Sequence, residues 1–346
     1  MGIHEIMRGG RVGLIAAILT AAAIGGARAE SNVTNVRFSL DSKIDGLAAP
    51  FLIGIDRGYY RADALNVTVD PAAEPTEPIA RVASGLYDMG IADINQLIKY
   101  RDQNPNSPVM AVFMVQNKPG YAVVGRKSRG VTKPKDLEGK KLGAPAADLS
   151  FSFWKLFAKV NEIDTSKVTI ENIGFPVREP LLQNGQVDAI TGYTYSILPN
   201  LKFMGLQTDE IVPLLMGDYN VSLYGNAIIV NPKFLAEKPQ AVKAFLQGYL
   251  KALKESIRSP LLAVDSALRR NDAALKEVEL ERLRLTLKEN VVTAEIKKVG
   301  LGDIDAARFD QAIEQLNQNN ELKTKFKTGD IFDGSHLPPF NLRKVQ

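Results

Sequence analysis

The chain has 346 residues, a formal net charge of +4 and no cysteine. With 45% hydrophobic and 24% charged residues, its composition is that of a globular protein rather than a disordered or fibrous one. Basic residues alternate with acidic ones, as in Lys251 to Glu255 and Lys276 to Lys288, which is typical of solvated helix faces. We therefore expect no nucleic-acid partner. The lack of cysteine excludes a disulfide framework and a lipid-modified cysteine.

The first residues have the pattern of an export signal. Arg8 and Arg11 precede an apolar run from Val12 to Gly26, and Ala27-Arg28-Ala29 has the small residues of a cleavage site. The run is shorter than the roughly 20 residues that span a bilayer. We expect a signal peptide over residues 1–29 and a mature protein in the periplasm; a retained membrane anchor is the alternative.

The mature chain alternates between strand and helix patterns, which predicts parallel sheets covered by helices. Length and pattern together indicate two lobes, the first formed by residues 30–118 and 227–346 and the second by residues 119–226. In the first part of the chain, we expect strands at Val36–Leu40, Leu65–Val69, Met89–Ala92 and Val109–Val115, and helices at Pro50–Tyr59 and Glu77–Ser84.

The second lobe repeats this alternation, after a break at Gln116 to Gly120 that we interpret as a crossing between the lobes. Strands are expected at Tyr121–Gly125, Lys141–Gly143, Val168–Ile173 and Val187–Thr191, with helices at Leu149–Val160 and Arg178–Asn184. Asn226–Val230 is the expected return crossing. Helices follow at Pro239–Leu253, Pro260–Arg270, Glu277–Asn290 and Ile304–Asn317, and the segment after Lys323 is expected to form an irregular arm.

A short internal repeat supports two related lobes. Gly85 is followed three residues later by Asp88 and an apolar strand, and Gly185 is followed in the same way by Asp188. Convergent turn chemistry is the alternative, because glycine ends helices and aspartate favours turns in many folds.

Ligands of open parallel sheets bind at the carboxyl ends of the strands, so the segments that leave each strand are the candidate site. We expect these segments to line one cleft between the lobes. The candidate binding residues are Asp41, Lys43, Asp45, Asp93, Asn95, Asn117, Asp148, Ser150, Ser152, Arg178, Tyr193, Tyr195, Tyr219 and Tyr224.

Asp148 and Arg178 each allow two interpretations. Ser150 and Ser152 lie in the first turn of the predicted helix and favour an anion there, yet Asp148 in front of them either caps the helix or contacts ligand. Arg178 opposes the dipole of its helix. It therefore either pairs with a neighbouring acid or binds an acidic ligand group.

The type of solute is suggested by two groups of residues. The four tyrosines Tyr193, Tyr195, Tyr219 and Tyr224 favour a planar ligand, although each alone fits core packing equally well. The carboxylates of Asp41, Asp45 and Asp93 disfavour a small inorganic anion unless Lys43 offsets them. An amine, an amide or a heterocycle suits them better.

Several motifs resemble one family of periplasmic binding proteins. They are Ala49-Pro50-Phe51 through Gly58-Tyr59-Tyr60, Gly85 to Asp93, and Arg178-Glu179-Pro180 through Ala189. From about Val36 to about Ile257 the chain is similar to the binders of nitrate, sulfonates, taurine and formyl-aminopyrimidine, whose fold the fungal thiamine-pyrimidine synthase shares. The resemblance implies a type II periplasmic binding protein fold, with two α/β lobes of mixed, mostly parallel sheets and two crossing strands as a hinge.

The resemblance also implies the partners: a small solute, and the permease and ATPase of an ABC importer to which a monomer delivers it. A biosynthetic enzyme is the first alternative. The resembled synthases rely on a cysteine-rich motif and a reactive histidine, whereas this chain has no cysteine and only His4 and His336. No nucleophile with a base, metal cluster or phosphate-binding loop is evident, so we expect no catalysis, cofactor or metal. A ligand-sensing lobe for a signalling partner is the second alternative.

Overall fold

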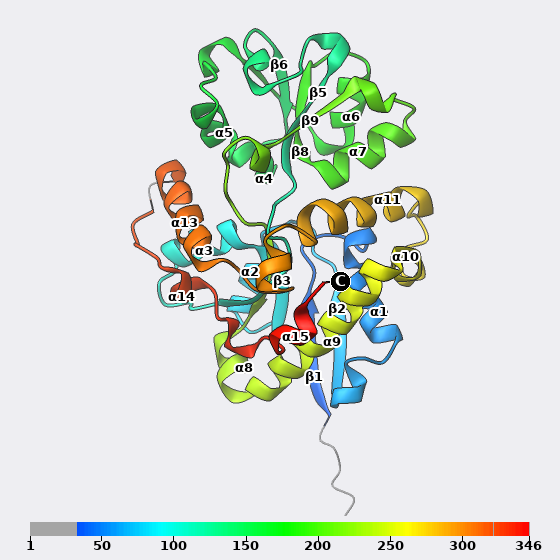
Figure 1. Ribbon diagram of the computed structural model, residues 1–346, viewed down its shortest axis with the longest axis vertical. Helices are drawn as coiled ribbons and strands as arrows, with labels where there is room; N and C mark the ends of the chain where they lie inside the picture. Colours follow the sequence, from blue (N-terminus) through cyan, green and yellow to red (C-terminus); the bar gives the residue numbers. More distant parts are fainter. Residues whose placement is uncertain (1–32, 321, 346) are drawn as a thin grey trace, which may run out of the picture. The chain divides into compact units, whose positions relative to one another are not determined.

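The computed structural model describes residues 33–320 and 322–345, and the predicted signal peptide over residues 1–29 lies outside them. The described chain forms two five-stranded sheets, each flanked by helices, and these define a first and a second lobe (Figure 1). The predicted class, two α/β lobes with mixed and mostly parallel sheets, is confirmed.

The first sheet has the strand order β2-β1-β3-β10-β4. β1 is parallel to β2 and β3, whereas β10 is antiparallel to both of its neighbours. β10, predicted as the return crossing, is thus a strand inside this sheet, and its apolar residues are all buried. The strands are β1 (Thr34–Ser39), β2 (Leu65–Asp70), β3 (Met89–Asp93), β4 (Met110–Met114) and β10 (Asn226–Val230).

The second sheet repeats this plan with the order β7-β6-β8-β5-β9. β6 is parallel to β7 and β8, and β5 is antiparallel to β8 and β9. The edge strand β9 was not predicted because it contains Pro213, a residue that sheets accept mainly at their edges. The strands are β5 (Tyr121–Arg126), β6 (Lys141–Ala144), β7 (Thr169–Asn172), β8 (Ala189–Tyr193) and β9 (Ile211–Leu215).

An aromatic core joins the first sheet to the long helix α9 (Pro239–Arg258) and to α1 (Ala49–Asp56). Phe245 of α9 stacks on Phe38 with 5.2 Å between ring centroids, and Tyr249 stacks on Phe51 at 4.5 Å. The other helices of this lobe are α2 (Glu77–Ala83), α3 (Ile94–Gln103), α8 (Pro232–Glu237), α10 (Pro260–Leu268), α11 (Lys276–Thr286), α12 (Ile296–Val299), α13 (Ala306–Asn320), α14 (Thr328–Ile331) and α15 (Phe340–Arg343).

The helices of the second lobe differ from the prediction at two points. The helix expected over Leu149–Val160 is divided at Phe153 into α4 (Leu149–Ser152) and α5 (Trp154–Val160), and Trp154 and Phe157 are buried as expected. α7 (Thr194–Phe203) was not predicted, because Pro199 inside it is usually a helix breaker. The remaining helix of this lobe is α6 (Arg178–Gln183).

The glycine–aspartate repeat forms the same turn in both lobes. Gly85 and Gly185 have positive φ angles of 77° and 69°, a conformation that favours glycine at a helix end. Three residues later, Asp88 accepts a 2.8 Å hydrogen bond from the backbone N–H of Arg37, and Asp188 accepts one of 2.9 Å from Lys141. Each aspartate therefore anchors the strand next to its own.

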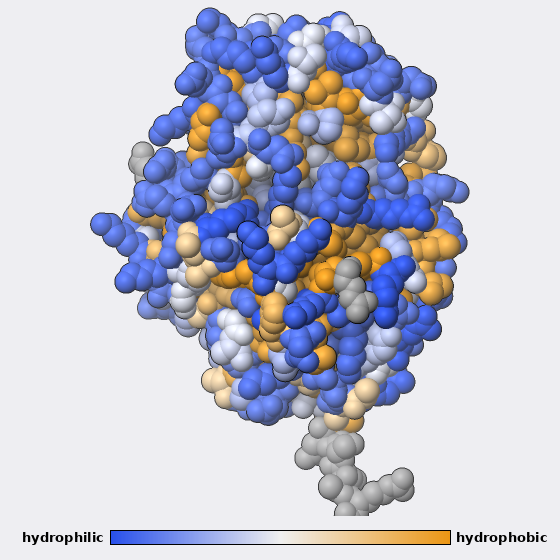
Figure 2. Space-filling view, viewed as in Figure 1, coloured by the Kyte–Doolittle hydropathy of each residue, from blue (hydrophilic) through white to orange (hydrophobic). Residues whose placement is uncertain are grey.

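The C-terminal segment packs on the first lobe. Phe332 forms a parallel bridge with Ala111, and the backbone N–H of Leu301 donates to the carbonyl of Arg343 at 2.9 Å. The expected irregular arm includes two short helices, α14 and α15. The face in Figure 2 is mostly hydrophilic, with apolar side chains in separate patches. Among the described helices, none has the length and apolar character to cross a membrane.

Candidate functional site

A cavity of about 790 Å³ lies between the two lobes. Its first-lobe side is formed by the segment that leaves β1, by residues 72–75 after β2 and by α11. Its second-lobe side is formed by Phe175 before α6 and by the α7 side chains of Ser196, Asn200 and Phe203. Three of the predicted residues line it: Asp41, Lys43 and Asp45.

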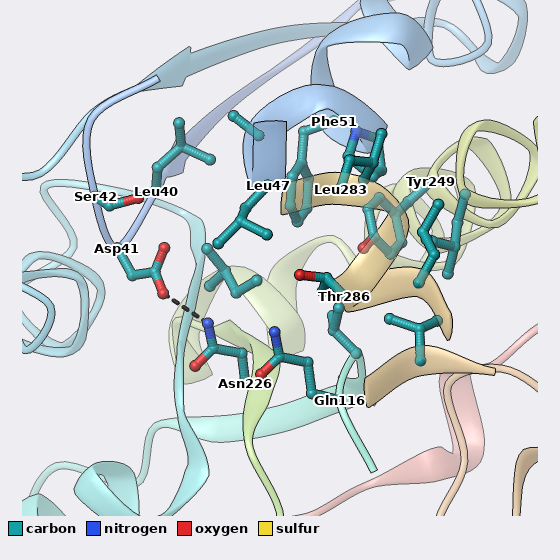
Figure 3. Close-up of a pocket in the computed structure, with 17 residues that line it drawn as sticks. Leu40, Asp41, Ser42, Leu47, Phe51, Gln116, Asn226, Tyr249, Leu283 and Thr286 are labelled. Carbon is teal, nitrogen blue, oxygen red and sulfur yellow. Dashed lines mark hydrogen bonds between the residues drawn. The ribbon is translucent and has the colours of Figure 1, made fainter. Parts of the chain in front are cut away.

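Two carboxylates form the polar part of this cavity. Asp41 accepts a 2.6 Å hydrogen bond from the side-chain amide of Asn226 (Figure 3). Burial, with the charge of Asp45 in addition, raises the pKa of Asp41 to about 7. Asp45 caps the 3-10 turn Gly46–Ala48 by accepting from the N–H of Leu47, and burial raises its pKa to about 6 despite the opposing charge of Arg282.

Asp41 also borders a small apolar cavity of about 30 Å³ inside the first lobe, which has room for about one water molecule. Figure 3 shows Leu47, Phe51 and Tyr249 around it, with Gln116 and Thr286 as its polar neighbours. A cavity of this size does not hold a solute.

Asp93 has structural partners. It caps α3 by accepting hydrogen bonds from the N–H groups of Asn95 and Gln96, and it accepts a further one from the hydroxyl of Tyr121. The side-chain amide of Asn95 donates to the carbonyl of Tyr224 at 2.7 Å. Burial raises the pKa of Asp93, while the bond from Tyr121 opposes this rise.

Three tyrosines form a stack in the second lobe, next to these carboxylates. The rings of Tyr121 and Tyr193 lie 5.8 Å apart, and those of Tyr193 and Tyr195 lie 4.9 Å apart with 12° between their planes. Burial raises the pKa of Tyr195, and the nearby charge of Asp41 raises it further. The ring of Tyr195 lies against Gly120, where an added Cβ would be 2.5 Å from it. Both predicted tyrosines of β8 and α7 are thus brought to the carboxylate side of the lobe interface.

The start of α4 is capped, as one of the two interpretations proposed. Asp148 accepts a 3.1 Å hydrogen bond from the N–H of Ser150, and burial raises its pKa. Ser152 donates to the carbonyl of Leu149 at 2.7 Å, whereas the buried hydroxyl of Ser150 has no hydrogen-bond partner among the described residues. A capping carboxylate at this helix start disfavours an anion there.

Arg178 pairs with its neighbour Glu179. Their charged atoms are 2.7 Å apart, and both residues are buried, with 6% and 5% exposure. Asn200 of α7 adds a 3.3 Å hydrogen bond to Glu179. The ion pair, one of the two alternatives from the sequence, is thus present in the structure.

The last three predicted residues, Tyr219, Asn117 and Tyr224, also do not line the 790 Å³ cavity. Tyr219 is half-buried, with its ring edge-on to Phe157 at 6.2 Å. Asn117 and Tyr224 lie in the two segments that connect the lobes, residues 115–120 and 216–225, and both contact Glu295: the amide of Asn117 donates to it at 2.9 Å and the hydroxyl of Tyr224 at 2.7 Å.

Arg308 of α13 holds the same two segments. It donates to the carbonyls of Asn117 and Leu223 at 2.9 and 3.1 Å, and it lies 4.0 Å over the ring of Tyr224. Sequence reasoning missed this network and also missed the cavity residues of α11, Glu279 and Arg282. A glutamate followed three positions later by arginine is common on helices, so no sequence signal marked them.

The comparisons with known proteins agree with this architecture. Residues 47–263 match the model of the "NMT1/THI5 like" family. The chain belongs to this family. The formylaminopyrimidine-binding protein of Halalkalibacterium halodurans is 25% identical over 81% of this chain and 84% of its own length. The riboflavin-binding protein RibY of Chloroflexus aurantiacus is 24% identical over 84% of this chain and 82% of its own length.

An enzyme is also among the relatives, with a shorter match. The 4-amino-5-hydroxymethyl-2-methylpyrimidine phosphate synthase of Schizosaccharomyces pombe is 22% identical over 61% of this chain and 62% of its own length. Among solved structures, the periplasmic aliphatic sulphonate binding protein SsuA of Escherichia coli matches with a TM-score of 0.65 and 13% identity, over 88% of this chain and 99% of its own. This family member thus has the solute-binding fold of ABC importers.

Proposed function

We propose that this protein is the periplasmic solute-binding component of an ABC importer and that its solute is a small, planar, nitrogen-containing heterocycle with N–H donors or a positive charge. The observation that carries the proposal is the arrangement of carboxylates and tyrosines at the lobe interface. Asp41 and Asp45 of the first lobe line the cavity, and the stacked Tyr193 and Tyr195 belong to the second.

The carboxylates support a donor or a cation as ligand. Asp41 forms no ion pair with any described residue, and its raised pKa reflects the cost of holding its charge away from water. An N–H donor or cationic group of the solute would stabilise that charge. Nitrate or a sulfonate would add a further negative charge and be disfavoured.

The tyrosines support a planar solute, because aromatic rings stack favourably in offset arrangements. Tyr195 is 3% exposed in the present arrangement, so its ring becomes available to a solute only when the lobes separate. We propose that the solute binds between separated lobes and that its contacts with both favour the closed form. Relatives that bind a formylaminopyrimidine and riboflavin support the same chemical class.

A thermal-shift screen of the mature protein, freed of bound solute by unfolding and refolding, tests the proposal. The panel contains 4-amino-5-hydroxymethyl-2-methylpyrimidine, riboflavin, taurine, nitrate and benzoate. A selective rise in melting temperature with a nitrogen heterocycle is expected, because binding to the folded state stabilises it. Selective stabilisation by nitrate or taurine would contradict the proposed ligand class.

A pair of variants then locates the site. Asp41→Asn is expected to abolish the shift caused by the heterocycle, whereas Asp209→Asn, at an exposed position outside the cavity, leaves it unchanged. If the heterocycle raises the melting temperature equally in both variants, the solute does not bind at Asp41. Small-angle scattering should show compaction when the solute saturates the protein.

A further inference from the structure

Helix α11 lies between the two lobes and comes from the part of the chain beyond the family match, which ends at residue 263. Figure 1 shows it running next to α7 of the second lobe, and these two helices pack against each other. Its buried residues include two charged ones, Glu279 and Arg282, with 7% and 8% exposure. Buried charges need partners, so their contacts indicate what this helix does.

Glu279 fixes the segment that carries Asp45. Its carboxylate accepts a 2.8 Å hydrogen bond from the backbone N–H of Gly46. The backbone of Gly46 also approaches α11 so closely that an added Cβ would lie 2.4 Å from the carbonyl oxygen of Glu279. The position of the Asp45 carboxylate therefore depends on α11.

Arg282 joins this segment to the second lobe. Its Nε donates to Glu279 at 2.9 Å and lies 4.0 Å from the carboxylate of Asp45. Its terminal nitrogen donates across the interface to the backbone carbonyl of Tyr195 at 3.3 Å. One buried guanidinium thus contacts a cavity carboxylate from one lobe and a tyrosine of the stack from the other.

Two other contacts between the lobes differ from this one. The ion pair of Lys202 with Glu281, also between α7 and α11, is 2.7 Å long, but its side chains are 40% and 38% exposed, so water and salt weaken it. The bond from Tyr121 to Asp93 is buried, but Tyr121 directly follows a connecting segment and is held near the first lobe by the chain itself. Tyr195 is also near this segment, because its ring lies against Gly120 and the backbone N–H of Thr194 donates to the carbonyl of Gly120 at 2.9 Å. The contact from Arg282 differs in that it comes from α11 of the first lobe and not from the connecting segment.

We propose that Arg282 is a positioning residue for solute capture: it couples Asp45 to Tyr195 and holds the two sides of the site at their closed separation. The link to solute capture rests on the proposed function; the coupling of the lobes does not. Without the contact to Tyr195 the closed form loses population, and the apparent affinity for a solute that needs this form falls in the same proportion.

Distance measurements between two spin labels test the proposal without any solute. The chain has no cysteine, so Lys127→Cys in the second lobe and Gln240→Cys in the first, both at exposed positions, give unique labelling sites. In Arg282→Lys the side chain keeps a positive charge near Glu279. It is too short, and lacks the planar shape, to donate a hydrogen bond to the carbonyl of Tyr195 at the same time. We expect its mean label distance to increase by more than about 2 Å and its distribution to broaden.

Arg284→Lys is the matched control, because Arg284 is exposed on the same helix. Its distance distribution should equal that of the unsubstituted protein. If Arg282→Lys does not fold, the double variant Arg282→Met/Glu279→Gln removes the cross-lobe donor while keeping the acceptor for Gly46. An unchanged distribution in the folded Arg282 variant would overturn the proposal. If the label distance increases in Arg282→Lys but no solute of the panel raises the melting temperature, the coupling of the lobes by Arg282 stands and the proposed solute class is rejected.

Discussion

Each lobe contains a buried arginine–glutamate pair beside the candidate site, and the two pairs differ in what else they contact. Arg178 and Glu179 of the second lobe are 2.7 Å apart, and the hydrogen bonds that the pair makes remain within that lobe. Arg282 and Glu279 of the first lobe are 2.9 Å apart, and Arg282 also reaches Asp45 and the carbonyl of Tyr195. The first pair is a local structural element, whereas the second connects the lobes.

The charge around the two pairs differs as well. Arg178 and Glu179 neutralise each other. Around Arg282, the carboxylates of Glu279 and Asp45 share one guanidinium, and Asp41 next to them has no ion pair among the described residues. The first-lobe side therefore has an excess of negative charge, and a solute with N–H donors would find its hydrogen-bond acceptors there.

The largest effect is expected from breaking the local pair. Arg178→Met leaves the Glu179 carboxylate buried without its cation, which should lower the free energy of unfolding by about 4 kcal/mol. Urea denaturation measures this. The double variant Arg178→Met/Glu179→Met is the control and should recover most of the loss. A folded, stable Arg178→Met that fails to bind an acidic solute would instead identify Arg178 as a ligand contact.

Asp93 should behave as a structural carboxylate, unlike Asp41. Asp93→Ala removes the cap of α3 and leaves the buried hydroxyl of Tyr121 without its acceptor, at a cost of about 3 kcal/mol. The urea concentration at its unfolding midpoint should fall. The midpoint of Asp93→Asn should fall less, because the asparagine side chain retains an acceptor oxygen. Equal stability of Asp93→Ala and the unsubstituted protein would contradict the assigned role.

The first-lobe carboxylates should make stability depend on pH. The pKa of Asp41 in the folded state, about 7, lies above its ordinary value of 3.8, so its contribution to stability is present at low pH and lost as the pH rises towards 7. Between pH 5 and 8 we expect a loss of about 2 kcal/mol, discounted because Asp41 is only half-buried. Asp41→Asn should flatten this dependence in chemical denaturation at the two pH values, whereas Asp209→Asn should not.

The smallest effect is expected from the exposed cross-lobe pair. Lys202→Met should change the free energy of unfolding by less than about 1 kcal/mol, because both partners are partly solvated. Its label distances should also stay unchanged, in contrast to those of Arg282→Lys. Opening of the lobes in Lys202→Met alone would transfer the coupling role from the buried contact to the exposed one.

Much of the fold follows from local patterns. The strands that follow Gly85 and Gly185 were predicted because glycine, aspartate and an apolar run act within a few residues of each other. α7 and β9 were missed for the same reason: Pro199 and Pro213 are local breakers, and only their positions in a helix and at a sheet edge show that they are tolerated.

The candidate site was predicted less completely than the fold. Asp41, Asp45, Tyr193 and Tyr195 were selected because they follow strands, and the structure brings them to one region of the lobe interface. Asn117 and Tyr224 were selected on the same ground but contact Glu295 near the connecting segments. Position after a strand identifies the right edge of a sheet, but not which side chains of that edge face the cavity.

The sequence by itself determined the two α/β lobes and most strands, because these depend on the spacing of residues that are neighbours in the chain. It left the role of Asp148 open, and the structure shows the cap. Only the tertiary structure decided that Asp41 bonds to Asn226, 185 positions away, and that Gly46 bonds to Glu279, 233 positions away. Arg282 meets Tyr195 across 87 positions. Contacts over such separations depend on how the lobes and α11 pack, which no local spacing in the sequence encodes.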